Sequence, residues 1–537
     1  MGRSVLTVAA ASGRTRARVF RFAILSLLLA DLSSVPCNAE APLPTVAAGQ
    51  GSPSVAASFA PFVDGSATGS ALAGPGSSQN VPPMPETDPS SVLRGSGEGM
   101  WSPDIAPTVP QEIHHVPVEA SWSDGFHLQT EDQQFQFHFG GVVQVDSTWL
   151  IGPQSLYNAP GNAANGVGNA SATLLRRSIL EADGTFYGQF DFFVAFDFAN
   201  ASNDNSGLQA PSFGNLTSSP APLNVWMQMR DVPILGNVRI GNQVKPIGME
   251  NNTSAAFLPF MERSDNNDAF YGPFDNGFAL GLTAQNWLPS ERLTWRYGIF
   301  RPATNVFGVA LNKYSTGARI TALPWYEDNG RQLIHLGLGY WGGELVQDEL
   351  RDRARPLLRN APGFAVPVFV DTSEIPGSQQ YTFGPEFAAV FGSLTIQAEY
   401  AGQFLTDATD TNGINQGTVF FHGGYVEALY FLTGEVQAYN RHDGAFDRVV
   451  PLHDFHLRKS DCQRGCGAWQ VGVRFSSLDL NDKTIQGGQI YDWTAGLNWF
   501  LNPNMKCQLN YIAEYRDMPG VPTGWINGVG VQAGYDF

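Results

Sequence analysis

Residues 134–149 read QFQFHFGGVVQVDSTW, and this stretch decides the fold of the chain. Apolar side chains mostly occupy odd-numbered positions of this stretch and polar side chains mostly occupy even-numbered ones. The apolar residues are Phe135, Phe137, Phe139, Val143, Val145 and Trp149, and the polar residues are Gln136, His138, Gln144, Asp146 and Thr148. Successive side chains of a β-strand point to opposite faces. The segment is therefore predicted to be a strand that separates an apolar environment from a wet one.

The same two-residue period recurs along the C-terminal three quarters of the chain. It is clearest in residues 189–198, 293–299, 334–340, 493–499, 505–511 and 529–537. A soluble sandwich shows some alternation too, but it seldom places aromatic residues at so many strand ends, where a membrane barrel needs interface girdles. Beyond the N-terminal region no apolar run reaches 18 residues, so no helix is predicted to cross a bilayer. Only helices and closed barrels satisfy the backbone in lipid, so we predict an all-β fold, a transmembrane antiparallel β-barrel.

The number of strands follows from length. Residues 122–537 form the predicted barrel domain, and each spanning strand with its turn or loop takes roughly 25 residues. This gives about 16 strands, enough to enclose an aqueous channel rather than a packed interior. The wide lumen predicts passive diffusion of small solutes.

The N-terminus has the features of a secretory signal peptide, residues 1–39. Arg14, Arg16, Arg18 and Arg21 precede a short apolar run over residues 22–30 that is too short to span a bilayer. The sequence Cys37-Asn38-Ala39 predicts cleavage after Ala39; a buried core helix and lipidation at Cys37 are the disfavoured alternatives. Residues 40–121 are rich in Pro, Ala, Gly and Ser, a composition that cannot bury enough apolar area to fold, and we expect a disordered linker.

Composition also limits the partners. The net charge of −18 argues against a nucleic-acid partner, since phosphate binding needs a basic surface. No nucleotide, catalytic or metal motif stands out, and the nine histidines show no arrangement suited to a barrel hydrolase. We therefore expect no enzyme activity, no cofactor and no metal. Cys462 and Cys466 bracket a polar turn that favours a small disulfide over a metal site with His453 and His456.

Several segments of the barrel region resemble the phosphate-selective porin O and P family. They are residues 175–184 with Arg176-Arg177, 239–250 running on to 260–264, 323–326, 335–338, 430–435, 444–446, 467–471, 478–482 and 496–504. The resemblance implies an outer-membrane porin of about sixteen strands that assembles as a homotrimer, with a loop folded into each pore. The terminal strand 529–537 ends on Phe537, which resembles the signal read by the barrel-assembly machinery. The implied location is the bacterial outer membrane, with its lipid bilayer as partner.

Selectivity depends on the polar face of the strands. Strand parity places Arg239, Lys245, Arg296, Arg319, Arg474 and Lys506 there, and one of Arg176 and Arg177 should join them, because adjacent residues point to opposite faces. Such a basic wall would favour small anions such as phosphate, whereas the alternative is that these are ordinary lumen charges. A further cluster at Arg351, Arg353, Arg355 and Arg359 is either an electropositive funnel or a solvated loop. The competing function is a structural anchor with a plugged barrel, and conductance discriminates the two.

Overall fold

The computed structural model describes residues 117–157, 171–199, 220–271, 277–301, 313–358, 368–456 and 465–537. The expected signal peptide and nearly all of the expected linker lie outside these ranges, so both remain predictions. None of the helices among the described residues is long and apolar enough to cross a membrane.

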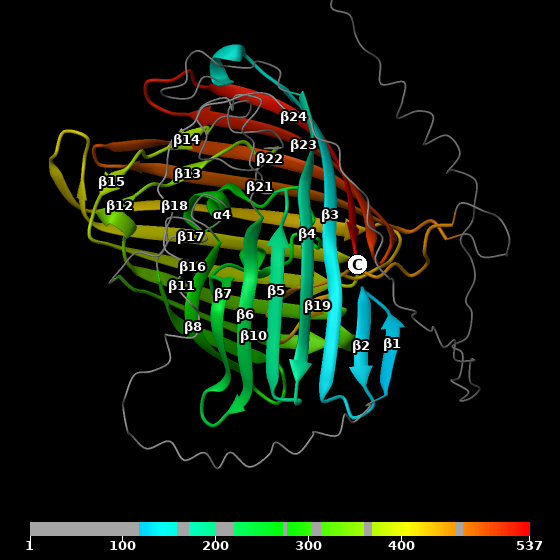
Figure 1. Ribbon diagram of the computed structural model, residues 1–537. Coiled ribbons are helices and arrows are strands. Elements are labelled where there is room, and N and C mark those ends of the chain that lie inside the picture. Colours follow the sequence, from blue (N-terminus) through cyan, green and yellow to red (C-terminus); the bar gives the residue numbers. More distant parts are fainter. Residues whose placement is uncertain are drawn as a thin grey trace, which may run out of the picture. The chain divides into compact units, whose positions relative to one another are not determined.

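The described chain is almost entirely β-structure (Figure 1). The long strands are β1 (Val118–Trp122), β2 (Phe126–Thr130), β3 (Phe135–Ile151), β4 (Ser171–Phe186), β5 (Phe190–Asp197), β6 (Ala221–Val232), β7 (Gly236–Val244), β8 (Phe278–Trp287), β9 (Leu293–Arg301), β10 (Ser315–Glu327), β11 (Gln332–Glu344), β16 (Gln379–Phe391), β17 (Leu394–Thr409), β18 (Asn415–Phe431), β21 (Ala468–Asp482), β22 (Ile485–Asn502), β23 (Met505–Asp517) and β24 (Gly524–Asp536). Two-residue strands lie between them: β12 (Glu349–Leu350), β13 (Arg353–Ala354), β14 (Val370–Asp371), β15 (Ile375–Pro376), β19 (Tyr439–Asn440) and β20 (Ala445–Phe446). The helices are α3 (Met249–Asn252) and α4 (Asp265–Phe270), with 3₁₀ turns η1 (Gln154–Tyr157), η2 (Asp328–Gly330) and η3 (Val346–Asp348).

Sixteen long strands, from β3 to β24, pair antiparallel with their neighbours and close on themselves, which confirms the predicted strand number. Closure occurs where β24 pairs with β3, from Asn527 opposite Ile151 to Asp536 opposite Val142. Phe537 completes the ladder, since its N–H donates to the carbonyl of Gly141 (3.0 Å) and its carbonyl accepts from the Gly141 N–H (2.7 Å). The hairpin of β1 and β2 then continues along the same edge of β3.

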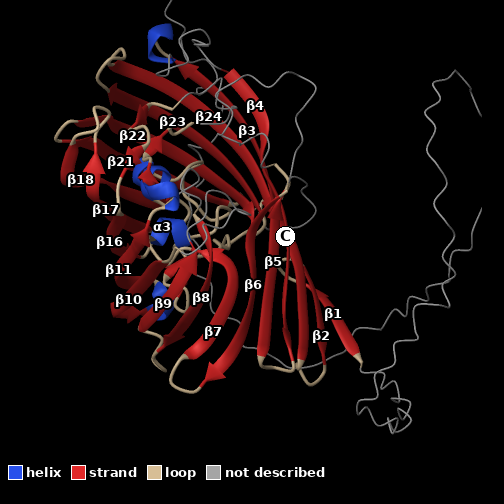
Figure 2. Cartoon of the chain, turned by 60° about the vertical axis from the view of Figure 1, so that its left-hand side comes forward, coloured by secondary structure: helices blue, strands red, loops and turns tan. Residues whose placement is uncertain are grey.

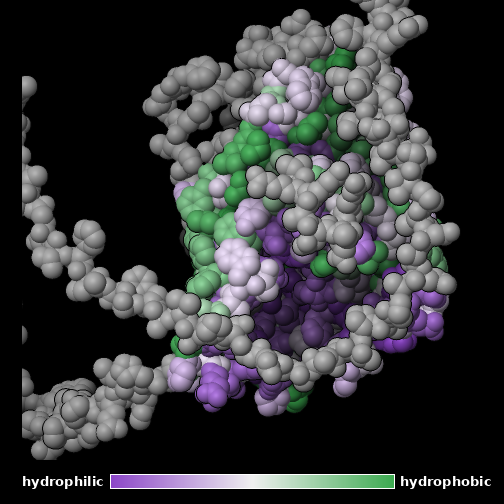
Figure 3. All heavy atoms as spheres, turned by 90° about the vertical axis from the view of Figure 1, so that its right-hand side faces the viewer, coloured by the Kyte–Doolittle hydropathy of each residue, from purple (hydrophilic) through white to green (hydrophobic). Residues whose placement is uncertain are grey.

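Alternation along the strands sorts side chains as predicted. On β3, Phe135, Phe137 and Phe139 are exposed on the outer face, whereas Gln144 and Asp146 are buried on the inner one. A space-filling view shows the result, a hydrophilic hollow beside a hydrophobic outer band (Figure 3). Apolar atoms outside and polar atoms inside are what a barrel needs when lipid surrounds it and water enters it.

One rim of the barrel carries mostly tight turns and the other carries long loops. Tyr187 and Gly188, both at positive φ, make one such turn between β4 and β5. By the usual arrangement of outer-membrane barrels, the rim of short turns faces the periplasm. The exception on that rim is the long connection between β18 and β21, residues 432–467, called here the turn segment.

Candidate functional site: the lumen

The described parts of three connections fold into the barrel. They are the inward loop between β7 and β8 (residues 245–277, with α3 and α4), the second inward loop between β11 and β16 (residues 345–378), and the turn segment. Figure 2 shows α3 inside the ring of strands. Apolar residues of the two inward loops, among them Ile247, Phe270 and Leu358, form one buried cluster with inner residues of the wall such as Phe421. The lumen is thus partly filled by the protein itself.

The inward loop is docked on the wall through backbone groups and glycines. The Glu399 carboxylate on β17 accepts hydrogen bonds from the N–H groups of Met249 and Glu250 at the start of α3 (2.8 and 2.7 Å). The Phe260 ring lies against Gly472 and Gly496, where an added Cβ would come within 3.2 and 2.9 Å of the ring. Small residues on the polar face of the strands therefore make room for the loop.

Both arginines of the Arg176-Arg177 pair face the lumen, which corrects the expectation that only one would. The register of β3 against β4 shifts so that Gln144 pairs with Arg177 and Val145 with Leu175, which leaves Arg176 as the extra residue of a β-bulge. A bulge interrupts strict alternation, and so two adjacent side chains can share a face. Glu262 of the inward loop binds both guanidinium groups.

Two further basic wall residues hold the same loop. Arg474 contacts the Glu250 carboxylate (3.2 Å), donates to the Glu262 carbonyl (3.1 Å) and lies over the Phe260 ring. Lys506 donates to the carbonyls of residues 256 and 258, both at 2.8 Å. These two cations neutralise the Glu250 carboxylate and supply hydrogen bonds to backbone carbonyls that the inward loop brings into the barrel.

Arg319 holds the turn segment instead. Its guanidinium makes a bidentate pair with Glu386 of β16 and donates to the carbonyls of Asp443 and Gly444, both at 2.7 Å. Glu386 also lies 3.3 Å from His335, whose other ring nitrogen is 2.6 Å from the hydroxyl of Tyr439. His335 is fully buried in this network.

Arg239, Arg296 and Lys245 form a different group. Arg239 stacks on Trp226 (3.7 Å to the ring centroid) and donates to the Gln228 side chain (3.1 Å). Arg296 lies opposite Arg319 in the β9–β10 register and donates to the Val244 carbonyl. Lys245 lies just beyond the end of β7, over the Trp341 ring. Among the described residues, no carboxylate lies within ion-pair distance of Arg239 or Arg296.

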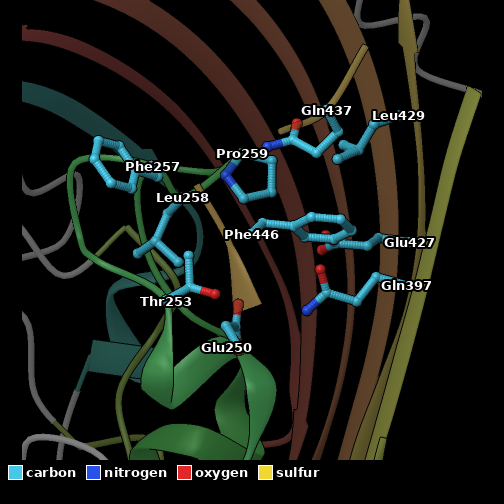
Figure 4. A pocket seen from close by; sticks show the side chains of 10 residues that line it. All are labelled: Glu250, Thr253, Phe257, Leu258, Pro259, Gln397, Glu427, Leu429, Gln437 and Phe446. Carbon is cyan, nitrogen blue, oxygen red and sulfur yellow. The ribbon is translucent and has the colours of Figure 1, made fainter. Parts of the chain in front are cut away.

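A small cavity lies between the inward loop, the wall and the turn segment (Figure 4). Its lining is half polar and half apolar: Glu250, Thr253, Gln397, Glu427 and Gln437 with Phe257, Leu258, Pro259, Leu429 and Phe446. One carboxylate oxygen of Glu427 is buried there without a hydrogen-bond partner among the described residues. The cavity shows that the inserted segments do not pack completely against the wall.

Acidic groups accumulate where α4 meets β22 and β23. Asp265 is fully buried, and the Ser476 hydroxyl lies between its carboxylate (3.2 Å) and that of Asp492. Burial, with the neighbouring carboxylates of Asp492 and Glu514, raises the pKa of Asp265 well above its ordinary value. The Ser476 hydroxyl thus links Asp265 of the inward loop to the wall.

The sequence left open whether the loop arginines form an electropositive funnel or a solvated loop. Among the described residues they do not form a set of free cations. Arg351 is paired with Asp371 (2.6 Å) and Glu374 (3.0 Å), and Arg355 is buried. Arg359 lies outside the described residues. In the described part of the second inward loop, these arginines are therefore paired with carboxylates or buried rather than exposed to the pore.

The carboxylates that bind the basic wall were missed by sequence reasoning, above all Glu250, Glu262, Glu386 and Glu399. Parity could have flagged Glu386 and Glu399, because both lie on the polar parity of their strands. Glu250 and Glu262 are in a loop, where alternation says nothing. Cys466 and Cys507 are free thiols among the described residues, and Cys462 lies outside them, so the small disulfide stays a prediction.

A closed antiparallel barrel, apolar outside and lined inside by polar wall and inserted loops, is the architecture of an outer-membrane channel of the porin type. The family model described as "Phosphate-selective porin O and P" matches residues 152–537, and the chain belongs to this family. It is a porin of the bacterial outer membrane.

Similar proteins include an uncharacterised protein of Caulobacter vibrioides, 25% identical over 447 residues (80% of this chain and 79% of that protein). Porin O of Pseudomonas aeruginosa is 24% identical over 423 residues (73% of this chain and 86% of that protein). Among solved structures, the outer-membrane channel DcaP of Acinetobacter baumannii aligns with a TM-score of 0.44 and 10% identity, covering 77% of this chain and all of that one. An anion-selective porin from Comamonas acidovorans aligns with a TM-score of 0.41 and 14% identity, covering 75% of this chain and all of that one.

Proposed function

We propose that this porin conducts small solutes with a preference for anions, phosphate among them. The observation that carries the proposal is the patch of Arg239, Arg296 and Arg319 on the inner face of β7, β9 and β10. Among the described residues, Arg319 alone of the three has a carboxylate within ion-pair distance. Three guanidinium groups with one directly paired carboxylate, Glu386, give a local positive excess, although the whole chain carries −18. Within low-dielectric walls, such an excess concentrates counter-ions.

The chemistry of the patch suits oxyanions. A guanidinium presents a planar fork of donors that matches phosphate and carboxylate geometry, and it is charged at any physiological pH. Asp443 and Asp191 interact electrostatically with Arg239 and reduce the field. A weak preference is therefore proposed rather than a strict filter. The family description and the relation to Porin O support the same direction.

The test is a reversal potential across planar bilayers in a KCl gradient. We expect the wild-type channel to prefer Cl⁻, and the double variant Arg239→Gln/Arg296→Gln to lose most of that preference. Arg331→Gln is the matched control, because it removes an exposed arginine from the rim of the same wall. Arg319→Glu is a poorer probe, since Arg319 also holds Glu386 and the turn segment.

A cation-selective wild-type pore would overturn the anion preference and leave a general porin. The observation that favours the competing function, a structural anchor with a plugged barrel, is that three segments partly fill the lumen. It predicts no ion current from correctly inserted protein, so the same recording separates the two.

We also propose a homotrimer, as the family resemblance implies. Chemical cross-linking of the detergent-extracted protein, followed by electrophoresis with and without heating, should show a heat-sensitive trimer band. A monomer at all cross-linker concentrations would reject it.

A further inference from the structure

The Arg176-Arg177 pair is occupied by the protein's own carboxylate. Glu262 lies 2.5 and 2.9 Å from Nε and Nη2 of Arg176, and 3.8 Å from Nη2 of Arg177. All three side chains are nearly completely buried. Because the β-bulge turns both guanidinium groups to the lumen, they converge on a single pair of oxygens.

This arrangement has the chemistry of an oxyanion site. Two guanidinium forks around two carboxylate oxygens supply charge-assisted hydrogen bonds of the kind that also bind phosphate and sulfate. Gln144 adds a further contact by accepting from Arg177 (2.6 Å). The Glu262 carboxylate thus takes the place that a diffusing oxyanion would take.

Glu262 is held in position by contacts other than its own carboxylate. Its carbonyl accepts from Arg474 (3.1 Å), and the next side chain, Arg263, donates to the carbonyls of Glu250 (2.9 Å) and Thr253 (2.7 Å). The loop is therefore fixed near the arginine pair even without the charge on Glu262. This makes the charge separable from the docking of the loop.

We infer that Glu262 is a built-in counter-ion that blocks an oxyanion-binding site in the pore wall and so limits the anion preference of the channel. The inference rests on the proposed function and names the residue that sets how strong the preference is. With Glu262 neutral, the charges facing the pair are the carboxylates of Asp146 and Asp197 and the guanidinium group of Arg263. The three guanidinium groups then outweigh the two carboxylates, and an oxyanion can displace the neutral side chain from the arginine pair.

The test compares Glu262→Gln, which keeps the shape and removes the charge, with Glu262→Asp, which keeps the charge. Glu250→Gln is the matched control. It removes a carboxylate of the same loop that, among the described residues, lies within ion-pair distance of one arginine, Arg474. Each channel is recorded in a KCl gradient, and then in KCl with added inorganic phosphate or sulfate at constant ionic strength. Thermal unfolding of the refolded protein is measured in the same salts.

For Glu262→Gln we expect the Cl⁻ to K⁺ permeability ratio to rise several-fold, up to about tenfold, the low end of what focused charge does to local counter-ion concentration. We also expect phosphate to reduce the Cl⁻ current and to raise the unfolding temperature. Glu262→Asp should behave as wild type, and Glu250→Gln should gain no phosphate dependence.

A folded Glu262→Gln channel whose ion preference and stability ignore phosphate would overturn the inference, even if the wild type is anion-selective. If Glu262→Gln does not refold in chloride, refolding with phosphate decides. Recovery supports the site, and no recovery refutes it. A cation-selective wild type that becomes phosphate-sensitive on Glu262→Gln would reject the proposed function and retain this inference.

Discussion

A charge placed on the outer face of β11 should destabilise the barrel according to its depth in the membrane. Leu338 is the seventh of the 13 residues of β11, is 49% exposed, and lies between Ile320 and Pro385 on the flanking strands. Arginine at mid-membrane on this face costs about 2–4 kcal/mol, and the cost falls to about 0–1 kcal/mol near the interfaces. Ile334 shares the face, four residues closer to the rim of short turns.

The difference between these positions follows from strand geometry. Four residues at a rise of about 3.4 Å, on a strand tilted by about 40°, place Ile334 about 10 Å nearer the interface. We therefore expect Leu338→Arg to lower the free energy of unfolding by about 2–4 kcal/mol and Ile334→Arg by about 1 kcal/mol or less. Leu338→Met should be nearly neutral, since it replaces one apolar side chain by another of similar volume.

The assay is denaturant unfolding of the barrel refolded into lipid vesicles, followed by tryptophan fluorescence. Equal penalties at 338 and 334, or none at either, would refute the assignment of this face to lipid. The inner face offers no simple control at Asn498, because its amide donates to the carbonyl of Pro259 and to Gln470. A charge there should also destabilise, by displacing the inward loop.

Two further predictions concern the inserted loop and the terminus. Phe260→Ala removes a ring that is 1% exposed and lies under Arg474, so it should lower the free energy of unfolding by up to about 3–5 kcal/mol. It should also raise single-channel conductance by loosening the inward loop. An unchanged conductance would mean that the loop stays docked without the ring. Phe537 makes two backbone hydrogen bonds and contacts the rings of Phe139 and Tyr535, so its deletion should lower the free energy of unfolding of detergent-refolded protein by about 1–3 kcal/mol. We also propose that the assembly machinery reads Phe537, so Phe537→Ala should lower insertion in cells more than it lowers stability. Normal insertion would argue against that role.

The wall of the barrel could be predicted from sequence because lipid imposes a strict period on it. Each strand of the wall must present one apolar face to lipid. The outward orientation of Phe135, Phe137 and Phe139 could therefore be predicted without any tertiary information. Alternation failed only where the chain departs from a regular ladder. At the bulge in β4, Arg176 and Arg177 share a face that the two-residue period assigns to only one of them.

The lumen could not be predicted in the same way, because its contacts join residues far apart in the chain. Lys506 reaches carbonyls 248 and 250 positions away, and Arg319 reaches backbone 124 and 125 positions away. Loop carboxylates such as Glu250 and Glu262 have no periodicity to mark their direction. Glycines on the inner face, such as Gly472 and Gly496, could have indicated where a loop packs against the wall. A residue without a side chain lets another segment come close to the backbone.

The pairing of wall cations with loop carboxylates explains why a count of basic residues does not give the ion preference of such a pore. A buried arginine needs a partner, because an uncompensated charge away from water is costly. Loops inserted into a basic barrel therefore gain from carrying carboxylates, and Glu250 and Glu262 occupy such places beside Arg474 and Arg176. Arg319 is paired with a carboxylate of the wall itself, Glu386 of β16. Under the proposed function, a diffusing ion meets the arginines that remain without a paired carboxylate among the described residues, Arg239 and Arg296. Selectivity should accordingly change most when a loop carboxylate changes, while the arginines of the wall stay the same.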